Sequence, residues 1–333
     1  MKRPLFILLS VVLFFAGCCL IDDDLSVCGA DYYLNYEVRL VTDVDMVIDE
    51  KLNKVSEQPI ADTLRKWLDP IFSGIAHDLD MNFYSMDERD TLLEDKHEII
   101  DAKEKTYTLY IPRKNYMHLA LVNTAENDNI SVVGTNHAKN LRLSQREGDT
   151  LNTHPTAVYT ARLPMEMKEE GNESFYVHLY MVSSAVALVV DSVAVQPMNM
   201  KVLFSGGATG FNIKDSVYTY DHPSLVRTER LTDQCYAVVA LPSRSETVSP
   251  IAPLLPEARK ETGFWQLRVY VTMPDNSITE TILNVDYPLL AGALEIIKVE
   301  MHDDGSVVPL QNAHVGATVT LDWKDGGSHD INI

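Results

Sequence analysis

Cys18 is the residue of this sequence best placed to undergo a chemical modification. It directly follows Phe15-Ala16-Gly17, and two small residues before a cysteine are typical of the bacterial lipobox, whose cysteine receives a lipid and becomes the new N-terminus. The apolar run before it, Leu5–Ala16, has the length of a secretion-signal core and is too short to span a bilayer. We therefore expect residues 1–17 to be a signal peptide and Cys18 to be the lipid-attachment site.

An acidic cluster, Asp22-Asp23-Asp24, lies just after this cysteine. It resembles the cluster that directs lipoproteins of Bacteroidota to the outer face of the outer membrane, although a solvated acidic tether would have the same composition. Residues 18–29 are therefore expected to form a lipidated acidic tether. The expected location is the outer membrane, through the N-terminal lipid, with the body facing the cell exterior.

The remaining motifs with possible chemistry are weak. Asp78–Asn82 has the opening spacing of a calcium loop without its glycine and later glutamate, so a strand entry is the simpler interpretation. Gly206–Gly210 lacks the lysine of a phosphate loop and reads as a turn between strands. The sequence contains no Gly-x-Ser-x-Gly motif, and none of its histidines stands in metal-ligand spacing. We expect no enzymatic activity, no cofactor and no metal ion.

Three cysteines remain after Cys18 is assigned to lipid. In an oxidising compartment Cys19 could pair with Cys28 across a short loop, or Cys28 could pair with Cys235. Cys235 precedes an apolar run, residues 236–241, and is expected to be a buried thiol at a strand end.

Length and charge limit the class of protein. Removal of the signal leaves 333 − 17 = 316 residues, which favours two domains. With 48 acidic against 28 basic residues the formal net charge is −20. That charge argues against nucleic acid as a partner and against docking on anionic lipid.

Alternation of apolar and polar residues dominates the sequence after residue 30, as expected for strands with one buried face. The clearest segments are Tyr32–Leu40, Tyr107–Ile111, Phe175–Met181, Trp265–Met273, Leu294–Met301 and Ala317–Trp323. Only residues 59–76 follow helical spacing, with Pro70 near their end. A polar, flexible stretch after Pro164 predicts a boundary between two β-sandwich domains, residues 30–165 and 172–333.

Several segments together resemble the FimB-type fimbrial anchor lipoproteins of Bacteroidales. The blocks that carry the resemblance are Cys18–Cys28, Tyr107–Asn123, Val177–Ala185, Asp303–Pro309 and Val315–Lys324, of which the last two are the most specific. The resemblance covers nearly the whole mature chain and departs at the doubled Cys18-Cys19.

The resemblance implies an all-β protein of two tandem transthyretin-like antiparallel β-sandwich domains, with one short crossover helix in the first. It further implies an outer-membrane lipoprotein that anchors a fimbrium at its base and limits fibre length. The implied partner is a fimbrial stalk subunit, bound by exchange of a strand.

Because the lipid is attached at the N-terminus, the first strand, near Tyr32–Val41, cannot be cut away without releasing the protein. We expect this strand to stay in its own sheet and the partner to bind at the C-terminal side. The candidate contacts are the alternating apolar residues of the last segment, Ala317, Val319, Leu321, Trp323, Ile331 and Ile333. An ordinary core strand over residues 315–323, with residues 324–333 as the donor, remains open. A surface lipoprotein that binds glycan or host protein, through Tyr218 and Tyr220, is the alternative function.

Overall fold

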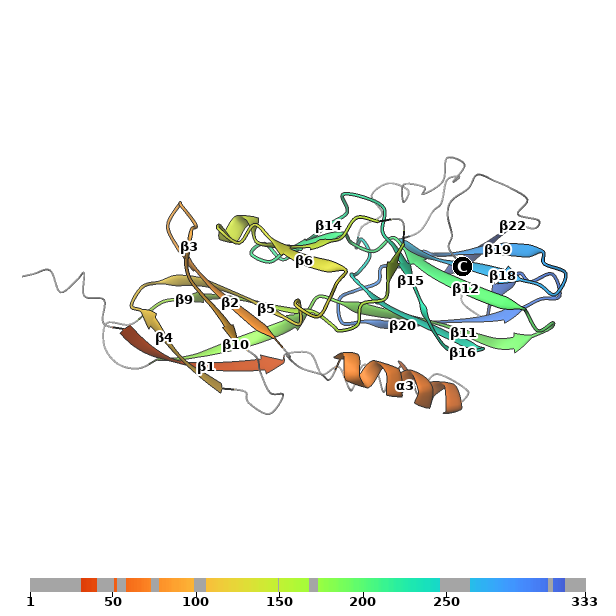
Figure 1. Ribbon diagram of the computed structural model, residues 1–333, viewed down its shortest axis with the longest axis horizontal. Coiled ribbons are helices and arrows are strands. Elements are labelled where there is room, and N and C mark those ends of the chain that lie inside the picture. Colours follow the sequence, from red (N-terminus) through yellow and green to blue (C-terminus); the bar gives the residue numbers. More distant parts are fainter. Residues whose placement is uncertain are drawn as a thin grey trace, which may run out of the picture.

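The computed structural model describes residues 31–40, 51–52, 58–72, 78–98, 106–148, 150–167, 173–245, 264–310 and 314–320. The residues of the predicted signal peptide (1–17), of the predicted tether with Cys18, Cys19 and Cys28, and of the tail 321–333 lie outside the described residues. The described part is built mainly of strands in four sheets, arranged along one long axis (Figure 1). The predicted all-β architecture of β-sandwiches with one helix is confirmed.

A 7-stranded and a 4-stranded sheet form the first sandwich. The larger sheet has, in spatial order, β3 (Leu92–Glu98), β2 (Leu79–Ser85), β5 (Tyr116–Val122), β9 (Tyr159–Met165), β10 (Glu173–Met181), β1 (Asp31–Leu40) and β4 (Thr106–Pro112). The smaller sheet has β14 (Val217–Thr219), β13 (Gly210–Asn212), β7 (Arg142–Gln145) and β6 (Ile130–Val133), with a 3-10 turn, η1 (Ala138–Asn140), before β7. An apolar cluster that includes Leu119, Leu143 and Phe211 fills the space between these two sheets.

The second sandwich packs a 5-stranded sheet on a 6-stranded sheet. The former contains β16 (Glu229–Thr232), β17 (Cys235–Ala240), β11 (Ser184–Val193), β20 (Leu294–Met301) and β21 (Val307–Pro309). The latter contains β22 (Val315–Thr320), β19 (Ile278–Val285), β18 (Trp265–Thr272), β12 (Asn199–Ser205), β15 (Leu225–Arg227) and β8 (Leu151–Asn152). Trp265 is fully buried between the sheets, where its indole N–H donates to the carbonyl of Tyr287 at 2.9 Å.

The predicted helix is present as α3 (Gln58–Phe72), but it covers the second sandwich and not the first (Figure 1). Leu64, Leu68 and Ile71 pack in one cluster with Ala187 of β11 and Ala237 of β17. Small side chains on these strands allow the helix to approach closely. Each large apolar side chain buried there contributes about 1.5–3 kcal/mol. Alternation in the sequence fails to show this packing, because β11 is buried on both faces.

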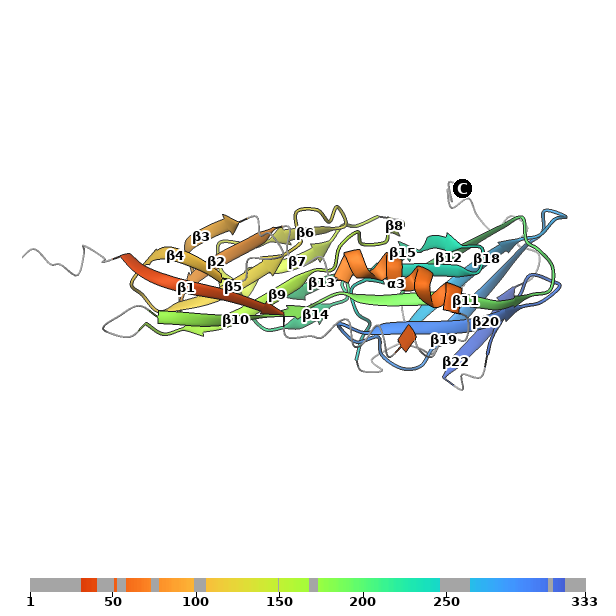
Figure 2. The same cartoon turned by 90° about the horizontal axis from the view of Figure 1, so that it is seen from below.

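The chain crosses between the sandwiches more often than the expected division at residues 165–172 implies. β10, assigned from the sequence to the second domain, pairs with β1 and β9 in the first. β13 and β14 return from the second half of the chain, where β14 pairs with β13 and β13 pairs with β7. β8 leaves the first half and pairs with β15 (Figure 2). β1 with β10, β11 with β20 and β15 with β8 pair in parallel, in contrast to the antiparallel sandwiches expected.

Candidate partner interface

Only two of the six predicted contact residues lie in the described part of the chain. Ala317 and Val319 belong to β22, at the edge of the 6-stranded sheet. Leu321, Trp323, Ile331 and Ile333 lie outside the described residues. The structure therefore describes only the first strand of the predicted interface.

β22 is an edge strand that contributes little to the core. It pairs antiparallel with β19, from Val315 opposite Val285 to Thr320 opposite Glu280. Val315 is buried, but every residue from Gly316 to Thr320 is exposed, and Val319 keeps 40% of its surface accessible. Both faces of the strand are thus open beyond its first residue. The expected alternation of buried and exposed side chains is absent from this described segment, so β22 is not an ordinary core strand there.

The other long edges of the described sheets differ from β22. β3 carries Glu94, Asp95, Lys96 and Glu98, and charged side chains on an edge oppose the addition of another strand. β4 is uncharged, but its Leu109 and Ile111 are buried in the core of the first sandwich. Within the described residues, β22 is therefore the long edge strand that combines no charge with exposure on both faces.

The first strand is fully built into its sheet. β1 lies between β10 and β4, and its register runs from Leu34 opposite Glu173 to Leu40 opposite Leu179 on one side. On the other side it runs antiparallel, from Asp31 opposite Pro112 to Glu37 opposite Thr106. Leu34 is completely buried. The position of β1 is as expected: the strand fills the groove that its removal would open.

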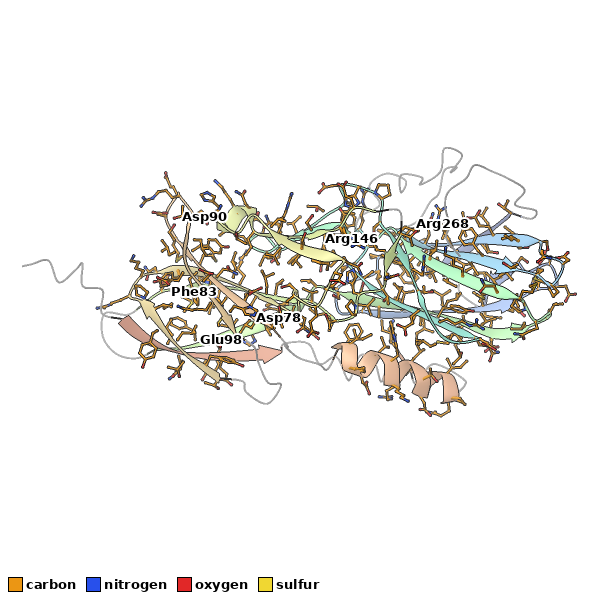
Figure 3. The ribbon with its side chains drawn as sticks, in the orientation of Figure 1. Asp78, Phe83, Asp90, Glu98, Arg146 and Arg268 are labelled. Atoms are coloured by element: carbon orange, nitrogen blue, oxygen red, sulfur yellow. The ribbon has the colours of Figure 1, made fainter. Side chains whose placement is uncertain are left out.

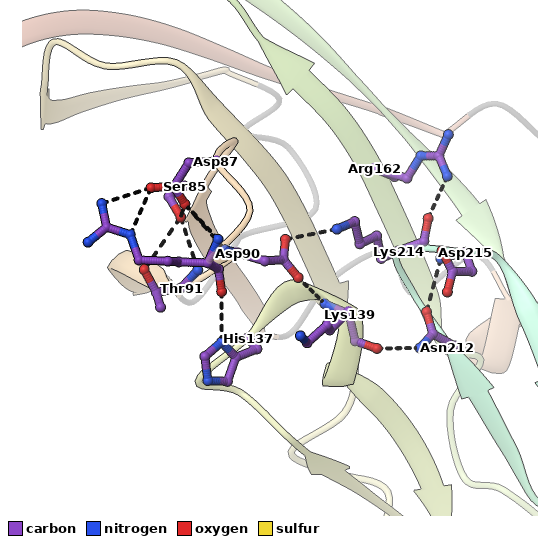
Figure 4. Close-up of polar contacts among 11 residues, drawn as sticks. Ser85, Asp87, Asp90, Thr91, His137, Lys139, Arg162, Asn212, Lys214 and Asp215 are labelled. Carbon is purple, nitrogen blue, oxygen red and sulfur yellow. Dashed lines mark hydrogen bonds and ion pairs between the residues drawn. The ribbon is translucent and has the colours of Figure 1, made fainter.

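A polar network ties the two sheets of the first sandwich together (Figure 4). Asp90, in the β2–β3 turn, accepts a hydrogen bond from the backbone N–H of Lys139 at 2.6 Å and forms an ion pair with Lys214 at 2.8 Å. The side chain of Asp90 is 8% exposed. Arg162 of β9 donates to the carbonyl of Lys214, and Asn212 of β13 donates to that of Lys139. No sequence signal pointed to this network, because its members lie up to 124 residues apart.

The buried side chains of His118, His154 and Cys235 are uncharged parts of the core at neutral pH. His118 stacks on Phe83 with ring centroids 4.5 Å apart, in the core where Figure 3 labels Phe83, and burial lowers its pKa to about 3. Burial alone lowers the pKa of His154 to about 4. Cys235 is a free, buried thiol at the start of β17, as predicted, and burial raises its pKa to about 12. A thiol with such a pKa is a poor nucleophile at neutral pH.

The residues of the alternative glycan-binding hypothesis are packed into the fold. Tyr218 lies 4.6 Å from Phe211 between ring centroids and donates its hydroxyl to the carbonyl of Val182 at 3.1 Å. Tyr220 is covered by the guanidinium of Arg244, 4.9 Å from the ring centroid. Among the described residues, no group of three His, Cys, Asp or Glu side chains gathers closely enough to hold a metal ion. No described helix is long and apolar enough to cross a membrane.

Comparison with known proteins adds the family. Residues 68–229 match the family described as fimbrillin-A associated anchor proteins Mfa1 and Mfa2. A candidate cell adhesion protein from Bacteroides eggerthii DSM 20697 superposes with a TM-score of 0.51 at 9% identity, over 88% of this chain and 96% of that chain. The fimbrial anchor protein Mfa2 from Porphyromonas gingivalis superposes with a TM-score of 0.47 at 12% identity, over 88% and 99% of the two chains. No curated protein matches the sequence.

The family match begins at Leu68, within α3, and ends at Glu229, the first residue of β16. It includes most of the first sandwich and the strands that link it to the second. The Bacteroides eggerthii protein shares the fold, and the two-sandwich architecture agrees with it. Over residues 68–229 the chain is similar to the fimbrillin-A associated anchor proteins, in agreement with the resemblance to fimbrial anchors of Bacteroidales in its sequence.

Proposed function

We propose that this protein anchors a fimbrium at its base. Lipid on Cys18 holds it in the outer membrane, its body faces the cell exterior, and a stalk subunit binds at the C-terminal side of the second sandwich by strand exchange. The family match supports the fimbrial role. The proposed role is mechanical and needs no catalytic group, cofactor or metal ion.

One observation carries the proposal: β1, near the N-terminus, is paired on both edges, whereas β22, near the C-terminus, is paired on one. At the N-terminal side β1 is paired on both edges, so its own position in the sheet is filled. At the C-terminal side β22 is paired on one edge and exposes both faces. Strand addition requires an unpaired edge, because the backbone N–H and C=O groups form the new ladder. A subunit that offers a contact at one end only ends a fibre, which accounts for a position at the base and for a limit on length.

Retention by lipid is energetically reasonable. Each methylene buried in the membrane contributes about 0.8 kcal/mol, and stable anchoring needs two membrane signals, such as two acyl chains. A multiply acylated Cys18 meets this requirement. Nine residues lie between Cys18 and Cys28, enough to separate the lipid from the folded body.

Deletion of residues 325–333 tests the strand contact. We expect fibres that detach from the cells and exceed their normal length, because the deletion removes Ile331 and Ile333, two of the predicted contact residues. A matched control replaces the same residues by a Gly/Ser segment of equal length, which keeps the chain length and removes the apolar side chains, and it should behave like the deletion. Fibres that stay attached at normal length in the deleted strain would contradict the strand-exchange contact.

A further inference from the structure

We propose that β1, with its neighbours β10 and β4, is a mechanical clamp that is loaded in shear when a fibre pulls against the membrane tether. The inference rests on the proposed anchoring function and specifies how the fold would resist the force. It follows from the direction of three strands and from the place where the chain passes between the sandwiches.

The orientation of β1 decides how a pull on the tether acts on the strand. β1 starts at the end of the molecule farthest from the second sandwich and runs towards it, nearly along the long axis (Figures 1 and 2). A pull on the N-terminal tether, away from the second sandwich, therefore acts along the axis of β1. Such a pull draws the strand lengthwise past its neighbours.

The parallel neighbour receives the opposite force. β10 runs in the same direction as β1, and only Val182 and Ser183 separate it from β11, the central strand of the 5-stranded sheet. β11 in turn pairs with β17 and β20. A load on the second sandwich therefore pulls on the C-terminal end of β10 while the tether pulls on the N-terminal end of β1. Opposite pulls on those ends of two parallel strands are the shear geometry.

Shear differs from peeling in how many bonds share the load. The bonds of a parallel ladder are evenly spaced along the strands, so sliding one strand strains the whole ladder at once. In peeling, the pairs at one end open first and the rest follow one at a time. The net contribution of each bond is only about 0.5–1.5 kcal/mol, so resistance depends on loading many of them together.

Side-chain packing adds to the resistance. Leu34 of β1 is fully buried in the same cluster as Leu109 of β4 and Val177 of β10. Sliding β1 along its axis drags this side chain out of its site before the ladder is lost. The antiparallel neighbour β4 ends beside the start of β1, since Pro112 is opposite Asp31. That arrangement provides an internal comparison, because pulling those two ends apart peels β1 instead of shearing it.

Single-molecule force spectroscopy on the mature chain tests the clamp. One handle is placed at the N-terminus and the other at an introduced cysteine, with Cys18, Cys19 and Cys28 changed to alanine; Cys235 is buried. Asp303→Cys, in the turn between β20 and β21, gives the shear geometry, and Lys114→Cys, in the turn between β4 and β5, gives the peeling geometry. We expect a rupture force several-fold higher in shear, on the same folded protein.

Two further variants assign the rupture to β1. Leu34→Ala should lower the shear force, whereas Val217→Ala, at a half-exposed position of β14 away from the ladder, should not. Equal forces in the two geometries, or a shear force that Leu34→Ala leaves unchanged, would overturn the clamp. Either result, obtained while cells retain their fibres normally, would leave the anchoring role intact; shedding of fibres that is independent of Cys18 would instead remove the anchoring role.

Discussion

The exposed edge of β22 supports a quantitative prediction for Val319→Lys. Val319 is 40% exposed in the free protein, so a strand added to this edge can bury the rest of its side chain. Full burial of a valine contributes about 1.5–3 kcal/mol, and 40% of this is about 0.6–1.2 kcal/mol. The Val319→Lys substitution removes this contribution from apolar burial. It also places a charge at the new contact, and removing that charge from water costs further free energy.

The expected sum is at least about 1.4 kcal/mol, a tenfold weaker affinity for the stalk subunit. The fold itself should change by less than about 0.5 kcal/mol, because the substituted side chain can extend into water. Binding of the purified mature chain to purified stalk subunit, by titration calorimetry, measures the first quantity, and denaturant unfolding measures the second.

Val217→Lys is the matched control. Val217 is 53% exposed, lies on the edge strand β14 of the first sandwich, and undergoes the same chemical change. It should leave the affinity unaltered. The reasoning is refuted if Val319→Lys binds as tightly as the native chain, or if Val217→Lys weakens binding equally.

Two further predictions concern stability. His154 is fully buried, neither ring nitrogen has a hydrogen-bond partner within the described residues, and its pKa of about 4 lies below the ordinary 6.5. Between pH 6.5 and 4 the imidazole of His154 is therefore protonated in the unfolded chain and neutral in the folded chain. The free energy of unfolding is retained above about pH 6.5 and falls by about 3 kcal/mol between pH 6.5 and 4. His154→Phe should reduce this loss in denaturant titrations across that range, and an unchanged pH dependence would show that the residue is not responsible. Lys214→Met should lower the free energy of unfolding by about 1–2 kcal/mol, because it removes the ion-pair partner of Asp90. This loss is smaller than the roughly 3–5 kcal/mol expected when a fully buried pair is broken, because the Lys214 side chain is 31% exposed. Arg230→Met, which breaks an exposed pair with Asp233, should cost less than about 0.5 kcal/mol, and equal losses would contradict the role of the Asp90 network.

Local patterns predicted the elements well. Alternation identified β1, β4, β10, β18 and β20 because each of these strands has faces of different polarity, and helical spacing identified α3. Pairing of distant segments could not be read from the same patterns. The polar stretch after Pro164 lies between β9 and β10, which pair with each other in the first sandwich. Periodicity does not show that β10 pairs with β1 on its other side.

The candidate interface was predictable in part. The position of β1 follows from the expected lipid at the N-terminus, since a tethered strand cannot be released. Exposure of β22 was not predictable, because Ala317 and Val319 alternate with threonines as they would in a half-buried strand. The Asp90–Lys214 pair escapes sequence reasoning altogether, because a single Asp and a single Lys carry no local signature.

Fibre retention after Cys18→Ala tests the central claim most directly. Cells that carry this substitution are labelled with a palmitate analogue and examined by electron microscopy, beside cells with Cys19→Ala as the control. The account predicts that Cys18→Ala abolishes the label and releases fibres into the medium, whereas Cys19→Ala keeps both label and attached fibres. Labelled protein and attached fibres in the Cys18→Ala strain would contradict it.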